Sequence, residues 1–209
     1  WVNLPDFTSS VSSLQMQRGV GTSTNGSGAF GASINLLTDA VSENAFAEIA
    51  NSVGSFNTFK HTLMFSTGLL NDHFEISGRL SKITSDGYID RATSDLNSYF
   101  LQGAYQDENT LIKAIMFGGH EITYQSWFGV DANTLNSDRT YNPAGEIYDE
   151  IGNLQGHYDR QVDDYTQDHY QFHWNQKLNV YTNLSLGLNY TWGRGAYEEY
   201  KDLWFEQNI

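Results

Sequence analysis

The sequence predicts an all-β fold: an antiparallel transmembrane β-barrel, incomplete in this chain, with about seven strands. Three observations predict it. Apolar and polar residues alternate with a period of two in successive segments. Most of these segments are close to the roughly 9 to 11 residues that a tilted strand needs to cross a bilayer core. The connections between them alternate between short and long, as they do in outer-membrane barrels.

The alternation is clearest in residues 183–193, where Leu184, Leu188 and Trp192 share one face and Asn189 belongs to the other. One face of this predicted strand is wholly apolar, so it needs either a covering protein layer or lipid. The predicted strands are residues 45–53, 58–69, 74–80, 96–106, 110–121, 166–178 and 183–193.

The connections fall into two classes by length. Short connections occur at residues 71–72, 107–109 and 179–182, and long ones at 85–95 and 124–164. Outer-membrane barrels have short periplasmic turns at one end and longer extracellular loops at the other. Single-chain bacterial barrels close with an even number of strands, so seven predicts an incomplete barrel or one misassigned strand.

The first 44 residues differ from the rest in being rich in Ser, Thr, Gly and Asn. Their glycines are densest in residues 18–36, a composition that suits turns. Alternation around Met16 before this stretch and Ile34 after it predicts a strand on each side of a glycine loop. We therefore divide the chain into residues 1–44 and a strand-rich part, residues 45–209.

Composition excludes several classes of protein. The chain has 209 residues, of which 11 are basic and 25 acidic, a formal net charge of −14. Phosphate backbones repel such a chain, so we expect no nucleic-acid partner.

With no cysteine, the chain has no disulfides, thiolate metal sites or cysteine nucleophiles. No stretch approaches the roughly 18 apolar residues of a membrane-spanning helix. The chain begins at Trp1 without a methionine, so we expect sequence before it.

Motifs for catalysis and metal binding are absent. Residues 26–31, GSGAFG, match G-x-G-x-x-G, but the residues that follow predict a strand and not the helix that a dinucleotide site needs. His169 and His173 share a strand face about 13 Å apart, too far for one ion. The acidic residues between Glu146 and Asp168 fit no EF-hand loop. We expect no enzyme, cofactor or metal site.

Three stretches resemble TonB-dependent outer-membrane receptors. Residues 14–38, LQMQRGVGTSTNGSGAFGASINLLT, resemble the closing segment of the plug domain of that family. Residues 56–91 look like its first barrel hairpins, and residues 118–129, GGHEITYQSWFG, like a strand running into an extracellular loop. Val20 stands where proline is frequent in the family, and Ala32-Ser33 where Gly-Val is common, which blurs the subfamily.

The resemblance implies that residues 1–44 are the C-terminal part of a plug domain and residues 45–209 the N-terminal part of a 22-stranded barrel. It implies import of a scarce ligand, such as a ferric siderophore, cobalamin or a glycan, across the outer membrane of a Gram-negative bacterium. The partners implied are lipid, the ligand, and a TonB-type energy-coupling protein that pulls on a segment N-terminal to this chain.

Candidate contacts follow from this resemblance. Aromatic loop residues stack on sugars or catecholate-like rings, but they can equally pack the loop or form an interfacial girdle. The charge of Arg18 between plug and barrel needs a partner, and Glu75 on the predicted lumen face is one candidate. The candidate ligand contacts are Thr24, Asn25 and Ser27 at the glycine turn and Tyr124, Trp127, Phe128 and Tyr141 in the long loop.

Two other classes stay open on the sequence. A soluble β-sandwich that binds carbohydrate also has alternating strands, although these are shorter and bury both facing sheets. A small closed outer-membrane barrel fits the chain length but gives the glycine-rich leader no role.

Overall fold

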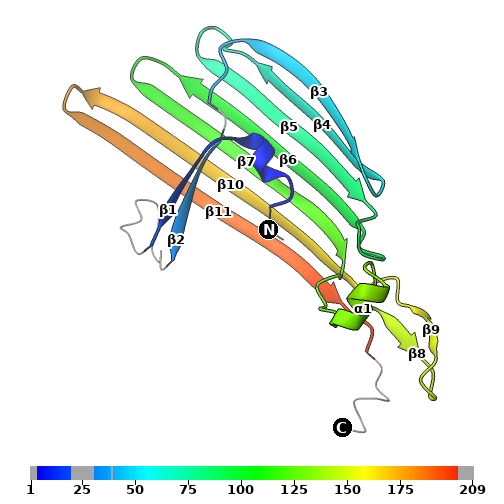
Figure 1. Cartoon of the computed structure of the whole chain (residues 1–209). Coiled ribbons are helices and arrows are strands. Elements are labelled where there is room, and N and C mark those ends of the chain that lie inside the picture. Colours follow the sequence, from blue (N-terminus) through cyan, green and yellow to red (C-terminus); the bar gives the residue numbers. More distant parts are fainter. Residues whose placement is uncertain (1–3, 20–30, 39, 202–209) are drawn as a thin grey trace.

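The computed structural model describes residues 4–19, 31–38 and 40–201. It confirms the all-β, antiparallel architecture, dominated by one seven-stranded sheet in the order β11-β10-β7-β6-β5-β4-β3 (Figure 1). Each strand of this sheet therefore lies beside the next one along the chain. The strands are β3 (Ala45–Gly54), β4 (Thr58–Thr67), β5 (Phe74–Ser85), β6 (Ser94–Gln106), β7 (Thr110–Tyr124), β10 (Val162–Asn179) and β11 (Thr182–Glu198).

All seven predicted strands are present, but several extend further toward the long loops than predicted. β5 continues to Ser85, β10 already begins at Val162, and β11 runs to Glu198. In these extensions the outward face, apolar elsewhere, carries polar residues such as Lys82 and Arg194, so the hydropathy alternation ends while backbone pairing continues. An alternating pattern can be recognised only where one face of a strand is apolar. Strand residues with two polar faces therefore escape prediction from the sequence.

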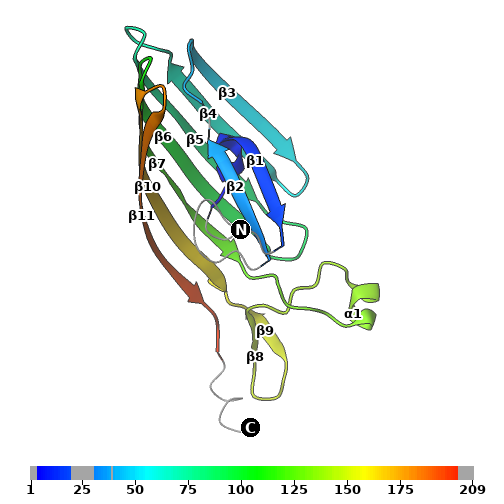
Figure 2. The ribbon, with the colours of Figure 1, turned by 90° about the vertical axis from the view of Figure 1, so that its left-hand side faces the viewer.

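The N-terminal segment lies on the concave side of the sheet (Figure 2). It contains a short 3-10 helix, η1 (Phe7–Ser10), followed by β1 (Val11–Arg18) and β2 (Ala32–Thr38). The last two pair antiparallel, with Met16 opposite Ile34, which confirms the predicted strands on either side of the glycine-rich stretch.

The two faces of the large sheet differ in the side chains that they bury and expose. Its concave face buries polar side chains under the N-terminal segment, among them Glu75 (1% exposed), Gln102 and Arg79. Its outward face exposes apolar side chains, such as Leu188 at 57%. The pairing register aligns outward-facing residues across all seven strands. One such row consists of Tyr190, Tyr170, Met116, Leu101, Gly78, Phe65 and Ala47.

The buried apolar core is small and lies on the concave side. Phe7 of η1 packs on Phe117 with ring centroids 4.5 Å apart, and Phe100 and Ile115 complete the cluster. Leu36 of β2 packs against the same cluster. This contact seats the N-terminal segment on β6 and β7.

The sheet is open, not closed into a barrel. Among the described residues, β3 and β11 pair with a neighbour on one side only. The long connection between β7 and β10 holds three elements that periodicity missed because they are short: α1 (Ala132–Ser137), β8 (Glu146–Tyr148) and β9 (Leu154–His157). In the described part of the chain, no helix has the length and apolar character needed to span a membrane.

Close packing in β11 depends on a glycine beneath an aromatic ring. A Cβ at Gly195 would overlap the ring of Tyr165 and lie 3.0 Å from the carbonyl oxygen of Asp164. A Cβ at Gly187, on the same face of the same strand, would have only His173 Nδ1 nearby, at 3.8 Å. The two glycines therefore form a matched pair.

We predict that Gly195→Ala lowers the free energy of unfolding by about 1–3 kcal/mol, because the Tyr165 ring must shift. Gly187→Ala should leave stability unchanged or slightly increased, since a strand glycine has more entropy to lose on folding. Urea midpoints followed by tryptophan fluorescence compare the two variants. Equal midpoints would contradict the packing argument.

Candidate functional site

The long loop between β7 and β10 rests on three buried amide side chains, Gln125, Asn142 and Gln161. Asn142 Nδ2 donates to the carbonyl oxygens of Gln125 (3.0 Å) and Asp90 (2.9 Å). Gln161 Nε2 donates to Gln125 Oε1 at 3.1 Å, and Gln125 Nε2 donates to the carbonyl oxygen of Glu198 at 3.1 Å. These bonds join the start, middle and end of the loop to the β5–β6 loop and to β11. The loop is thus held in a defined conformation.

Two of the predicted ligand contacts serve the loop itself. Tyr124 is the last residue of β7, not a loop residue, and its buried hydroxyl donates to the carbonyl oxygens of Ala144 (3.1 Å) and Tyr158 (2.9 Å). The hydroxyl of Tyr141 donates to Glu146 Oε1 at 2.6 Å. This bond, with some burial, raises the pKa of Tyr141 to about 12. Both hydroxyls therefore form hydrogen bonds within the protein.

The other two predicted aromatics are available at the surface. Trp127 is 58% exposed and Phe128 is also exposed, with their ring centroids 6.3 Å apart. Trp127 also stacks on Tyr197 of β11, with centroids 6.1 Å apart and planes at 16°. We call Trp127, Phe128 and Tyr197 the aromatic platform. Flat exposed rings on a rigid base suit a ligand with a planar or sugar face.

Sequence reasoning missed Tyr197 because the apolar alternation of this strand ends before it. Pairing of β11 with β10 continues to Glu198 and places Tyr197 on the same face as Asn189. The surrounding loop is acidic: residues 125–161 include six acidic and two basic side chains, a net charge of −4. An anionic ligand would be repelled there.

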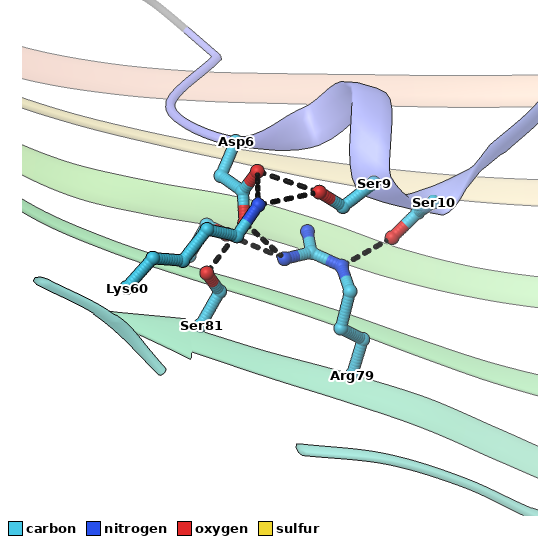
Figure 3. A network of polar contacts seen from close by, with 7 residues as sticks. Asp6, Ser9, Ser10, Lys60, Arg79 and Ser81 are labelled. Atoms are coloured by element: carbon cyan, nitrogen blue, oxygen red, sulfur yellow. Dashed lines mark hydrogen bonds and ion pairs between the residues drawn. The ribbon is translucent and has the colours of Figure 1, made fainter. Parts of the chain in front are cut away.

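A second polar site lies where η1 meets the large sheet (Figure 3). Asp6 Oδ1 accepts from Lys60 Nζ and from Ser9 Oγ, both at 2.6 Å. Asp6 Oδ2 accepts from Arg79 at 3.1 Å and from the Ser81 hydroxyl. We call these five residues the Asp6 cluster. It is an ionic and hydrogen-bonded contact between the N-terminal segment and strands β4 and β5.

Arg79 extends this contact in a buried setting. Its Nε donates to Ser10 Oγ at 2.6 Å, and another guanidinium nitrogen donates to Ser98 Oγ at 3.0 Å. The Arg79 side chain is 3% exposed and that of Asp6 is 7% exposed. Removing either charge would break a buried ion pair, which is costly.

Burial opposes ionisation of Asp6, but the hydrogen bonds from Lys60, Ser81 and Ser9 outweigh it and lower the pKa of its carboxyl below 3.8. A carboxyl whose pKa is depressed on folding stabilises the fold fully above its unfolded pKa. That stabilisation is lost as the pH falls through the folded-state pKa. The Asp6 cluster is therefore acid-labile.

Glu75 is buried on the concave face, but the expected pair with Arg18 is not among the described ion pairs. Glu75 instead accepts from Ser66 Oγ at 2.8 Å, Gln102 Nε2 at 3.2 Å and the backbone N–H of Ser42 at 3.0 Å. Arg18 ends β1 on an exposed stretch. An ionic contact between the N-terminal segment and the sheet is made by Asp6.

Three predicted contacts, Thr24, Asn25 and Ser27, lie outside the described residues. Within the ranges described, no cluster of three or more His, Asp or Glu side chains is placed to hold a metal ion. No known protein-family profile matches the chain, and no curated protein matches it. The site is therefore judged on its geometry and chemistry alone.

We predict that Asn142→Ala costs about 1–3 kcal/mol, because it leaves buried carbonyl and N–H groups without partners. The loop should then be cleaved faster in limited proteolysis. Asn136→Ala, which removes an exposed amide from α1 in the same loop, is the matched control. Equal cleavage rates would show that the buried amides do not order the loop.

We also predict that the amides of residues 6–10 lose hydrogen-exchange protection as the pH falls below about 3.8, because protonation of Asp6 weakens its bonds to Lys60 and Arg79. In Asp6→Asn, protection should be low throughout and show no such pH step. Asp131→Asn, which alters a carboxyl in the exposed loop, should keep the step. A step that persists in Asp6→Asn would assign it to another group.

Proposed function

We propose that this chain is part of an outer-membrane transporter of the TonB-dependent receptor kind, which imports a scarce ligand. One observation carries the proposal: the seven-stranded sheet exposes apolar side chains on its outward face and buries polar side chains of its central strands on its concave face. In water the exposed apolar face would need a covering layer, whereas in lipid only backbone pairing must be complete.

The dimensions of the apolar face fit a bilayer. On β11 it runs from Leu184 to Trp192, about 27 Å along the strand at ~3.4 Å per residue. A tilt of about 40° reduces this to about 21 Å, comparable to the ~25 Å apolar band of outer-membrane barrels. Toward the long loops the outward face becomes polar, with a Lys82–Asp95 ion pair and His120 bonded to Asp164 at 2.8 Å. This is the expected change at a membrane surface.

The remaining parts then take on roles in transport. The N-terminal segment, held by the Asp6 cluster, acts as the end of a plug on the lumen side. The aromatic platform and the acidic loop are the candidate ligand surface, and their charge favours a neutral or cationic ligand. A TonB-type energy-coupling protein would act on sequence upstream. Catalysis has no part in this proposal.

The two other classes are less well supported. Neither the carbohydrate-binding β-sandwich nor the small closed barrel is favoured by a specific observation. In the portions of the chain described here, no second sheet covers the outward face, and β3 and β11 do not pair with each other. The described residues of the N-terminal segment also have a place, against the concave face.

Adjacent residues on β11 test the proposal. Leu188 lies on the outward face and Asn189 on the concave face. We predict that Leu188→Arg costs roughly 2–4 kcal/mol if it lies near the bilayer midplane, and sharply lowers accumulation in the outer membrane. Asn189→Arg should accumulate normally. Immunoblots of membrane fractions measure both. A tolerated Leu188→Arg with a damaging Asn189→Arg would reverse the two faces.

A further inference from the structure

We propose that the long-loop end of the concave face binds a small organic cation carrying an alkylated ammonium group. The carboxylates of Glu121 and Asp163 balance its charge, and the rings of Tyr197 and Trp127 contact its alkyl groups. We call these four residues the cation site. The inference rests on the proposed transport function and specifies the chemical class of the ligand.

Strand register brings the two carboxylates and Tyr197 together. β7 ends, β10 begins and β11 ends at the same end of the sheet, beside the long loop (Figure 1). Tyr197 lies directly opposite Asp163, and Tyr165 lies directly opposite Glu121. Glu121 and Asp163 are therefore diagonal neighbours on adjacent strands, with Cα atoms about 7–8 Å apart, a distance that long side chains span.

Negative charge collects here without a basic side chain beside it. On β6, β7, β10 and β11, two cross-strand rows form this end of the concave face, and Glu121 and Asp163 are their only charged members. Lys60 continues the first row on β4, three strands from β7, but it is bonded to Asp6. Because like charges repel, a cation bound between the carboxylates is stabilised by both. The rows are Leu96, Glu121, Tyr165 and Gly195, and Ser94, Thr123, Asp163 and Tyr197.

Glu121 is buried in an unusual way. It is only 5% exposed, yet its carboxylate accepts no hydrogen bond and forms no ion pair with any residue in the described ranges. Glu75, the other buried glutamate of the concave face discussed above, has three hydrogen-bond donors around it. A buried carboxylate without a partner weakens the fold. Side chains that weaken the fold in this way are expected at binding sites.

Aromatic rings adjoin the two carboxylates. Trp127, which is 58% exposed, stacks on Tyr197 with ring centroids 6.1 Å apart. The Tyr165 ring lies against Gly195, two residues before Tyr197 on the same face. The faces of aromatic rings attract cations, and alkylated ammonium groups are bound by such rings. Rings next to carboxylates therefore favour an ammonium group.

The same chemistry disfavours the other classes of ligand. Within the described ranges, no group of three or more His, Asp or Glu side chains is placed to hold a metal ion, so an organic cation fits better. A neutral sugar donates hydrogen bonds to carboxylates but leaves their charge unbalanced. The long loop, with a net charge of −4 over residues 125–161, raises the local concentration of cations.

Choline and dimethylbutanol are a matched pair of probes, because dimethylbutanol has the same shape with carbon in place of the charged nitrogen. Isothermal titration calorimetry on the protein, extracted from the outer membrane in detergent, measures both affinities. We expect choline to bind about tenfold more tightly than dimethylbutanol. Maltose is the sugar probe, and we expect it to bind more weakly than choline.

Variants assign the binding to the cation site. Glu121→Gln should weaken choline binding about tenfold, whereas Glu150→Gln, which removes an exposed carboxylate from the long loop, should leave it unchanged. Tyr197→Leu should weaken choline binding about threefold. Because Glu121 has no hydrogen-bond partner among the described residues, Glu121→Gln should melt at the same or a higher temperature than the unaltered protein.

Several outcomes would overturn the cation site. They are no measurable choline binding, equal binding of choline and dimethylbutanol, tighter binding of maltose, and choline binding that survives Glu121→Gln. A lower melting temperature of Glu121→Gln would show that this carboxylate has a structural partner, which also contradicts the inference. The proposed function fails separately, if the unaltered protein does not reach the outer membrane.

Discussion

The structure depends on one constraint: the side of the main sheet that lies under the N-terminal segment buries polar side chains, whereas the opposite side exposes apolar ones. Glu75, Arg79 and Gln102 lie under the N-terminal segment, while Leu188 and its neighbours are exposed on the other side. Hydrophobic burial drives folding in water, so an exposed apolar face must meet another apolar surface. What then holds the chain together on its inner side is hydrogen bonding and charge pairing, with a small aromatic cluster around Phe117.

This inversion changes which residues determine specificity. In the proposed bilayer setting, any apolar side chain of suitable size would serve on the outward face, because fluid lipid adapts to its shape. On the inner face each polar group needs a partner with defined geometry. The amides of Gln125, Asn142 and Gln161 and the carboxylate of Asp6 therefore fix the positions of the loop and the N-terminal segment more tightly than the apolar residues do.

The regular part of the fold could be predicted because its signal is local. The alternation from Leu184 to Trp192, and that around Met16 and Ile34, lies within single strands. Strand ends were missed where both faces become polar, and Tyr124 was misplaced because the predicted strand stopped at residue 121. The Asp6 cluster escaped prediction because its partners lie 54 to 75 residues away in sequence. Tyr197 was missed because it lies on such a strand end.

The two attachments of the N-terminal segment differ in kind. At Asp6 the contact is ionic, and Lys60 is partly exposed, so added electrolyte and acid both weaken it. At Gly68 the fit is steric, and neither dissolved ions nor protons alter a van der Waals boundary. Salt and acid thus weaken the contact at Asp6 without altering the close steric approach of the β2–β3 linker at Gly68.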